Sequence, residues 1–203
     1  QKPYTADQYL NILNNSKDSI YQQILDELDA HISRFPQDAN VRISRCEVIE
    51  KAYYDYYEEY NPKEEEFEIC LDQLMQDFPD HQEVLQFKLD RIYGESAIEY
   101  ANEVIDKIKN SDEEWDDRHI SRFYAKLAQN YRYSDETRLS IKYALRAQEL
   151  IDTLDLSVVL ANSYLELKEN SKAESALLEK LDTTQGSWIL KSKANLLLKA
   201  GNA

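Results

Sequence analysis

The chain of 203 residues contains little glycine, proline or cysteine, with 3 Gly, 4 Pro and 2 Cys. The scarcity of Gly and Pro argues against a many-stranded β fold with frequent tight turns. With so few glycines, sharp backbone turns at a catalytic site are also hard to build. No apolar run approaches the ~18 residues of a transmembrane helix. Basic residues number 24 against 39 acidic ones, a net charge of −15, so nucleic acids and anionic membrane surfaces are poor partners.

Helical periodicity extends over almost the whole chain, as Ile20, Ile24, Leu28 and Ile32 illustrate. The Phe35-Pro36 and Phe78-Pro79 steps predict helix ends, because the residue before proline is forced out of the α region. Asp38 is a candidate N-cap, and Pro62 after Asn61 suits the first position of a helix running into residues 63–77. We therefore predict an all-α chain of about eleven helices.

Two internal repeats predict how the helices are arranged. Residues 28–41 (LDAHISRFPQDANV) align without a gap with residues 71–84 (LDQLMQDFPDHQEV), 43 residues later. Residues 127–131 (LAQNY), 160–164 (LANSY) and 194–197 (ANLL) recur at intervals of 33. Helix pairs of this length cannot each close a core alone and must stack. The repeats predict one domain over residues 1–203, a right-handed α-solenoid of antiparallel helix pairs.

The C-terminal repeats resemble the tetratricopeptide family. Ala161 and Tyr164 match the small and aromatic residues of helix A, and Ala173 and Leu177 match the small and large residues of helix B. Ala194 and Gly201 match two positions of a further repeat that stops at Ala203, so we expect the natural protein to continue. The resemblance implies a superhelical scaffold whose A helices line a groove for peptides or partner proteins.

The resemblance weakens toward the N-terminus. Ala128 and Tyr131 fit the helix A positions, but the following helix B, judged from Ala144 and Ala147, is expected to be displaced by about four residues. Residues 1–110 match by architecture only, as divergent helix pairs, whereas residues 111–203 are more regular.

Tyrosine supplies the first candidate binding residues. Of 15 tyrosines, five fall within Tyr53–Tyr60, and Tyr53, Tyr56, Tyr57 and Tyr60 share one broad helical face. Such a stripe either packs against neighbouring helices or lines a groove for a peptide. Tyr53 and Tyr57 are our candidates for the second role.

Amides at equivalent repeat positions supply the other candidates. Gln129, Asn162 and Asn195 each follow the small residue of a helix A, a position that faces the groove in the resembled family. Lys191, four residues before Asn195, resembles part of the clamp by which some members of that family hold a C-terminal carboxylate. The corresponding positions hold Val158 and Ala125, so the clamp is incomplete.

Sequence motifs of catalysis are lacking. There is no HExxH, calcium-binding, phosphate-binding or GxSxG pattern. His119 follows Asp116-Asp117-Arg118, which suits either an acid–base cluster or the solvated first turn of a helix. We predict a protein that is not an enzyme and carries no metal or cofactor.

The two cysteines, Cys46 and Cys70, do not form a CxxC pair. A hairpin turning at Asn61-Pro62 would leave them offset by roughly 10 Å along the helix axis, beyond the ~7 Å reach of a disulfide. The sequence therefore predicts two buried thiols. Low cysteine use fits the cytosol, whereas export after removal of a signal peptide is equally open.

Charge is divided unevenly. Residues 1–117 carry 11 basic and 29 acidic groups, and residues 118–203 carry 13 and 10. The anionic part either serves solubility, steers a basic partner or associates with another copy. We predict a scaffold or adaptor that binds a peptide or partner protein. The alternative is an N-terminal regulatory domain of a longer enzyme, receptor or exported assembly factor whose activity lies beyond residue 203.

Overall fold

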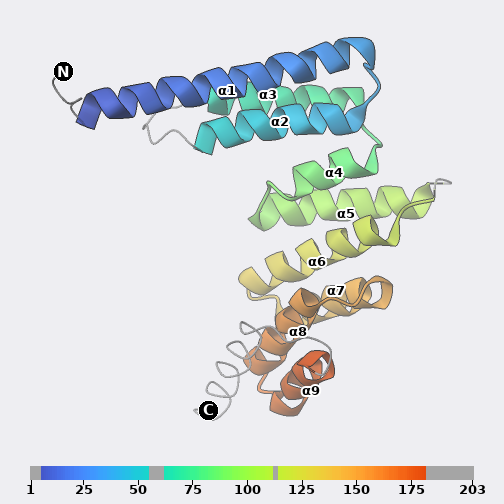
Figure 1. Ribbon diagram of the computed structural model, residues 1–203. Helices are drawn as coiled ribbons and strands as arrows, with labels where there is room; N and C mark the ends of the chain where they lie inside the picture. The colour runs from blue at the N-terminus through green and yellow to red at the C-terminus, as the bar shows by residue number, and fades with distance from the viewer. Residues whose placement is uncertain (1–5, 55–61, 112–113, 182–203) are drawn as a thin grey trace. The chain divides into compact units, whose positions relative to one another are not determined.

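The computed structural model describes residues 6–54, 62–111 and 114–181, and it confirms the all-α prediction over these ranges, which contain nine helices and no strand (Figure 1). The helices are α1 (Ala6–Arg34), α2 (Ala39–Tyr54), α3 (Pro62–Asp77), α4 (Gln82–Leu89), α5 (Gly94–Asn110), α6 (Asp117–Tyr133), α7 (Thr137–Leu150), α8 (Leu154–Glu166) and α9 (Asn170–Leu181). None of these helices is long and apolar enough to cross a membrane.

Residue contacts divide the chain into two units, Gln1–Lys88 and Leu89–Ala203. In the first unit α2 packs against both α1 and α3, and in the second unit each helix from α5 to α9 packs against the next. Helix α8 also contacts α6, its second neighbour along the chain. Packing between consecutive helices is what helix pairs in a repeat array require, and the single-domain plan stays a prediction.

The 43-residue repeat is visible in the backbone of the first unit. The same backbone hydrogen bond occurs at the end of both helices. Phe35 N–H donates to His31 O (2.9 Å), and Phe78 N–H donates to Leu74 O (3.0 Å). The turns that follow also recur, with Asp38 and His81 donating to the carbonyls of Phe35 and Phe78. The two Phe-Pro steps therefore end α1 and α3 in the same way, as the sequence predicts.

The predicted helix starts in this unit are also found. Pro62 is the first residue of α3. Asp38 Oδ1 accepts a hydrogen bond from the backbone N–H of Val41 (3.2 Å), so the predicted N-cap of α2 is confirmed. That hydrogen bond is the main reason why the pKa of Asp38 is lowered, and the neighbouring His31 adds to the effect.

The 33-residue repeat is equally clear in the second unit. Two residues after its last helical residue, each of α6 and α8 is followed by a residue in the left-handed region, Asp135 at φ 61° and Lys168 at φ 60°. The next residue closes the turn, with Glu136 N–H donating to Tyr131 O (2.9 Å) and Glu169 N–H to Tyr164 O (2.8 Å). The α6–α7 and α8–α9 pairs are thus joined by one turn geometry at one spacing.

This shared turn corrects the expected four-residue displacement of helix B after Ala128. Ser140, twelve residues after Ala128, occupies the position that Ala173 holds after Ala161. Ser140 is fully buried, and its Oγ lies 3.0 Å from the Oγ of Ser163 on α8. The displacement was wrong because serine, with its hydroxyl paired, serves as the small residue there.

The start of α5 depends on a contact from a neighbouring helix. Helix α5 begins at Gly94, whose φ of +64° favours glycine. Its backbone N–H donates to Oδ1 of Asn130 on α6 (2.7 Å), while Asn130 Nδ2 donates to the carbonyl of Lys126 (2.8 Å). A buried side chain from a neighbouring helix therefore holds this helix start.

We expect Asn130→Ala to destabilise the protein by about 1–3 kcal/mol, because the buried Asn130 side chain makes hydrogen bonds to both Gly94 N–H and the Lys126 carbonyl, and both are lost. Gln129→Ala, on the exposed neighbouring residue, is the matched control and should change stability by less than about 0.5 kcal/mol. Chemical denaturation followed by circular dichroism measures both. Equal stability of the two variants would contradict this role of Asn130.

The prediction of two buried thiols is wrong, because Cys46 and Cys70 form a disulfide with their Cα atoms 5.7 Å apart. The expected offset of roughly 10 Å counted residues from a turn at Asn61-Pro62, whereas the described part of α2 ends at Tyr54. Cys46 therefore lies eight residues before the end of α2, and Cys70 lies eight residues after the first residue of α3. Since α2 and α3 run in opposite directions (Figure 1), the cysteines lie at the same level.

Candidate functional site

The described residues place two of the predicted binding amides on neighbouring helices. Gln129 lies on α6 and Asn162 on α8, 33 residues apart, and these two helices are in contact. Ala125 and Val158 lie one helical turn before them and are half-buried. We call the four residues Ala125, Gln129, Val158 and Asn162 the amide face.

Both amides of this face have unused hydrogen-bonding capacity. Gln129 is exposed, and its side chain makes no hydrogen bond with the described residues. Asn162 is half-buried, and its Nδ2 donates to the carbonyl of Val158 (2.9 Å), which leaves Oδ1 without a donor from the described residues. An amide can donate and accept at once, so such groups suit the backbone of an extended peptide.

The amide face is bordered by polar contacts that join α6, α7 and α8. Arg132 Nε lies 3.6 Å from Glu166 Oε1, and the hydroxyl of Thr137 donates to Glu166 Oε2 (3.0 Å). Beneath the face, Ala128 and Ala161 are fully buried. Ala128 belongs to the core shared by α6, α7 and α8, and Ala161 packs with Ala173 and Leu177 of α9.

A second feature of this unit is a stack of three tyrosine rings. Tyr143 of α7 lies between Tyr131 (ring centroids 5.4 Å apart) and Tyr124 (6.1 Å), both on α6. Burial raises the pKa of Tyr143, and the neighbouring Tyr131 adds to the shift. The rings are half-buried, and Tyr124 and Tyr143 pack against the core beneath, so they serve packing between α6 and α7. Sequence reasoning missed this stack because its members are scattered along the chain.

The remaining predicted binding residues fall elsewhere. Tyr53 lies in the last turn of α2, in a stretch where only the backbone is described. Tyr57, Lys191 and Asn195 lie outside the described residues. The structure therefore brings together only Gln129 and Asn162, and the proposed roles of the other four stay predictions.

The acidic turn around His119 is only partly solvated. Asp116 caps α6 by accepting the backbone N–H of Arg118 (2.8 Å), and Asp116, Asp117 and Arg118 are exposed. His119 itself is buried, so the side chains of this turn that contact solvent are those of Asp116, Asp117 and Arg118. No group of His, Cys, Asp or Glu suited to hold a metal ion occurs among the residues that the structure describes.

No protein-family model matches the chain, and neither a curated protein nor a solved structure matches it.

Proposed function

We propose that the protein is a scaffold or adaptor that binds a peptide or partner protein on the amide face. The observation that carries the proposal is the equivalence of Gln129 and Asn162, which the 33-residue repeat places at the same position on two contacting helices. The Gln129 amide and the Asn162 Oδ1, which have no hydrogen-bond partner among the described residues, are suited to bond a ligand backbone. The equivalent Ala125 and Val158 add an apolar surface beside them.

In this proposal the helices form a right-handed α-solenoid of antiparallel pairs, similar to tetratricopeptide repeats. Support comes from the two repeated turns at 33 residues and from the contact of α8 with both α6 and α7. Helices α6 and α8 then act as A helices that contact the ligand, while α7 and α9 pack behind them. The protein carries out no catalysis in this account, and Tyr53, Tyr57, Lys191 and Asn195 would extend the binding surface.

The test is a quantitative pull-down with the intact chain and with the variant Gln129→Ala/Asn162→Ala. Two lost hydrogen bonds of about 1 kcal/mol each predict recovery of bound partners reduced by about tenfold or more. Gln76→Ala/Asn110→Ala is the matched control, because Asn110 Nδ2 donates to the carbonyl of Asp106, as Asn162 does to Val158. Equal recovery with the two double variants would contradict the proposal.

We also propose that the protein works in an oxidising compartment, the exported alternative of the two considered from sequence. The support is the disulfide between Cys46 and Cys70, a bond that reducing cytosol does not maintain. Peptide mapping of the protein from its source cells, with thiols blocked at lysis, should recover the two cysteines cross-linked. Recovery of two blocked thiols would contradict this location.

A further inference from the structure

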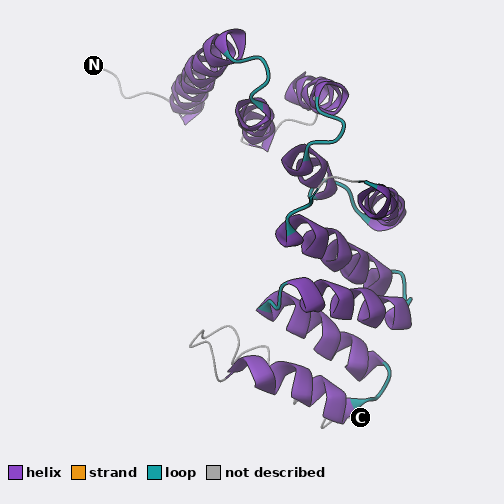
Figure 2. Cartoon of the chain, turned by 90° about the vertical axis from the view of Figure 1, so that its right-hand side faces the viewer, coloured by secondary structure: helices purple, strands orange, loops and turns teal. Residues whose placement is uncertain are grey.

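A pocket of about 390 Å³ lies in the first unit, far along the chain from the amide face. Its lining comes from three helices: Asp29 and Ile32 of α1, Arg42, Arg45, Cys46 and Ile49 of α2, and Glu66, Ile69, Cys70, Gln73 and Leu74 of α3. In the described part of the chain α1 and α3 each pack against α2 but not against one another. The pocket is therefore a trough between α1 and α3 whose floor is α2, and Figure 2 shows α2 between them.

The trough is apolar inside. The disulfide, Ile49 and Leu74 form its buried part, and Ile32 and Ile69 stand at its sides. Ile69 is 61% exposed. An exposed aliphatic side chain at the edge of an apolar hollow favours contact with an apolar group of a ligand.

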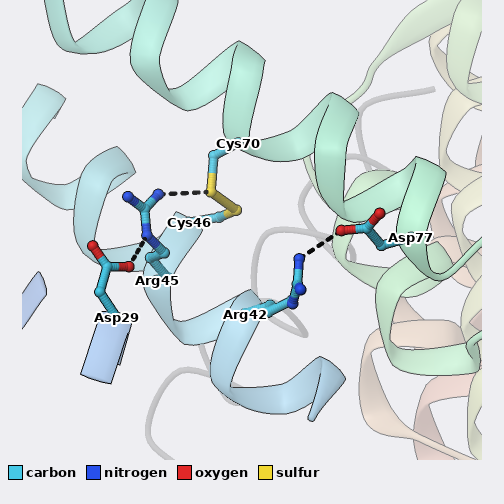
Figure 3. The surroundings of a disulfide bond; sticks show 6 residues. All are labelled: Asp29, Arg42, Arg45, Cys46, Cys70 and Asp77. Atoms are coloured by element: carbon cyan, nitrogen blue, oxygen red, sulfur yellow. Dashed lines mark hydrogen bonds and ion pairs between the residues drawn. A yellow bond between two sulfur atoms is a disulfide. The ribbon is translucent and has the colours of Figure 1, made fainter. Parts of the chain in front are cut away.

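The two arginines of the trough are already neutralised. Arg45 Nε donates to Asp29 Oδ1 (2.6 Å), and its Nη1 faces the Sγ of Cys70 (3.7 Å). Arg42 Nη1 pairs with Asp77, as Figure 3 shows. Since each guanidinium is matched by a carboxylate, the arginines do not make the trough a site for anions.

The segment that contains the trough is strongly acidic. Residues 1–88 contain 8 Lys and Arg against 19 Asp and Glu, a net charge of −11. Helix α3, which supplies five of the lining residues, carries six acidic side chains and one lysine. Such a field attracts cations and repels anionic ligands.

We propose that this trough binds a lysine- and arginine-rich amphipathic helix of a partner protein. A trough between two helices over a third receives the apolar face of such a helix, with an aliphatic side chain entering between Ile32 and Ile69. The basic face of the ligand then lies near the acidic side chains of α3. This site is separate from the amide face, so failure of either proposal leaves the other standing.

The test uses the full chain and a fluorescent peptide of about 18 residues, five helical turns of leucine and lysine in amphipathic order. Fluorescence anisotropy is measured at about 0.15 M salt, where distant surface charges are screened. Ile69→Lys should weaken binding about tenfold relative to Ile20→Lys. Ile20 is the matched control, because it is 58% exposed on α1, lies outside the trough and undergoes the same change of charge.

Further comparisons distinguish docking in the trough from non-specific electrostatic attraction. Ile69→Ala should weaken binding by a smaller factor than Ile69→Lys, and both variants should keep the circular dichroism of the parent because Ile69 is exposed. A peptide of the same composition in scrambled order, and one with glutamate in place of lysine, should bind more weakly. Equal affinity of the Ile69→Lys and Ile20→Lys variants, or binding of the scrambled peptide as tightly as the amphipathic one, would overturn the proposal.

Discussion

Replacing both Cys46 and Cys70 by alanine is expected to lower the free energy of unfolding by about 3 kcal/mol. The disulfide joins positions 24 residues apart, and removing such a cross-link restores chain entropy to the unfolded state. It also loosens the packing of α3 on α2, where Cys46 is 1% exposed and belongs to the core with Leu71 and Leu74. Guanidinium denaturation of the intact chain measures the loss.

A reducing agent provides the internal control for this prediction. Reduction of the parent protein should reproduce most of the loss of stability, whereas the doubly substituted variant should not respond to the reductant. The trough peptide should also bind less tightly to the reduced protein, because the disulfide lines the trough floor. A parent protein whose stability is the same with and without reductant would show that the two sulfurs are not joined.

Truncation of Phe123 to alanine is expected to be the most destabilising single change in the second unit, by about 3–5 kcal/mol. Phe123 is 0% exposed and lies on α6, which packs against both α5 and α7. The substitution leaves a cavity that neighbouring helices can only partly fill. Tyr133→Ala is the control, because that aromatic ring is 77% exposed on the same helix.

The two variants are compared by thermal unfolding of the intact chain. Phe123→Ala should lower the transition temperature strongly, while Tyr133→Ala should leave it within a few degrees of the parent. Comparable small shifts in both would mean that α6 is not packed on both sides. The tyrosine stack offers a second readout, since loosening of α6 against α7 should change the near-ultraviolet circular dichroism.

Local signals in the sequence identified most helix boundaries of the first unit. Phe35-Pro36, Phe78-Pro79, Asp38 and Pro62 act through their own backbone geometry, which requires no knowledge of the rest of the fold. The gapless alignment of residues 28–41 with 71–84 succeeded for the same reason, because equal turns produce equal hydrogen bonds. These helix boundaries could be predicted because the residues that determine them lie within a few positions of the helix ends.

The features that were not predicted depend on residues distant in the sequence or on residue types that are unusual at their positions. The start of α5 depends on Asn130, 36 residues further along the chain. The turns after α6 and α8 contain Asp135 and Lys168 in left-handed conformations, where glycine is the usual signal. The disulfide depended on the register of α2 against α3, and a shift of a few residues decides whether two cysteines on facing helices are within reach.

The candidate site was predicted only as far as the repeat could be aligned. Gln129 and Asn162 were found because the positions 33 residues apart keep a small residue before each amide. The trough of the first unit was not found, because its lining comes from three helices and depends on the Cys46–Cys70 bond. Its one visible sign in the sequence is Ile69, which falls between acidic residues on α3 and off the apolar stripe of that helix.

Small-angle X-ray scattering of the intact chain tests most directly whether the helix pairs stack in chain order. A compact globule of 203 residues has a radius of gyration of about 17 Å. Stacked pairs predict a radius clearly above that value and a distance distribution with a long tail. A radius near 17 Å with a symmetric distribution would contradict the solenoid, and with it the equivalence of positions from which the amide face is derived.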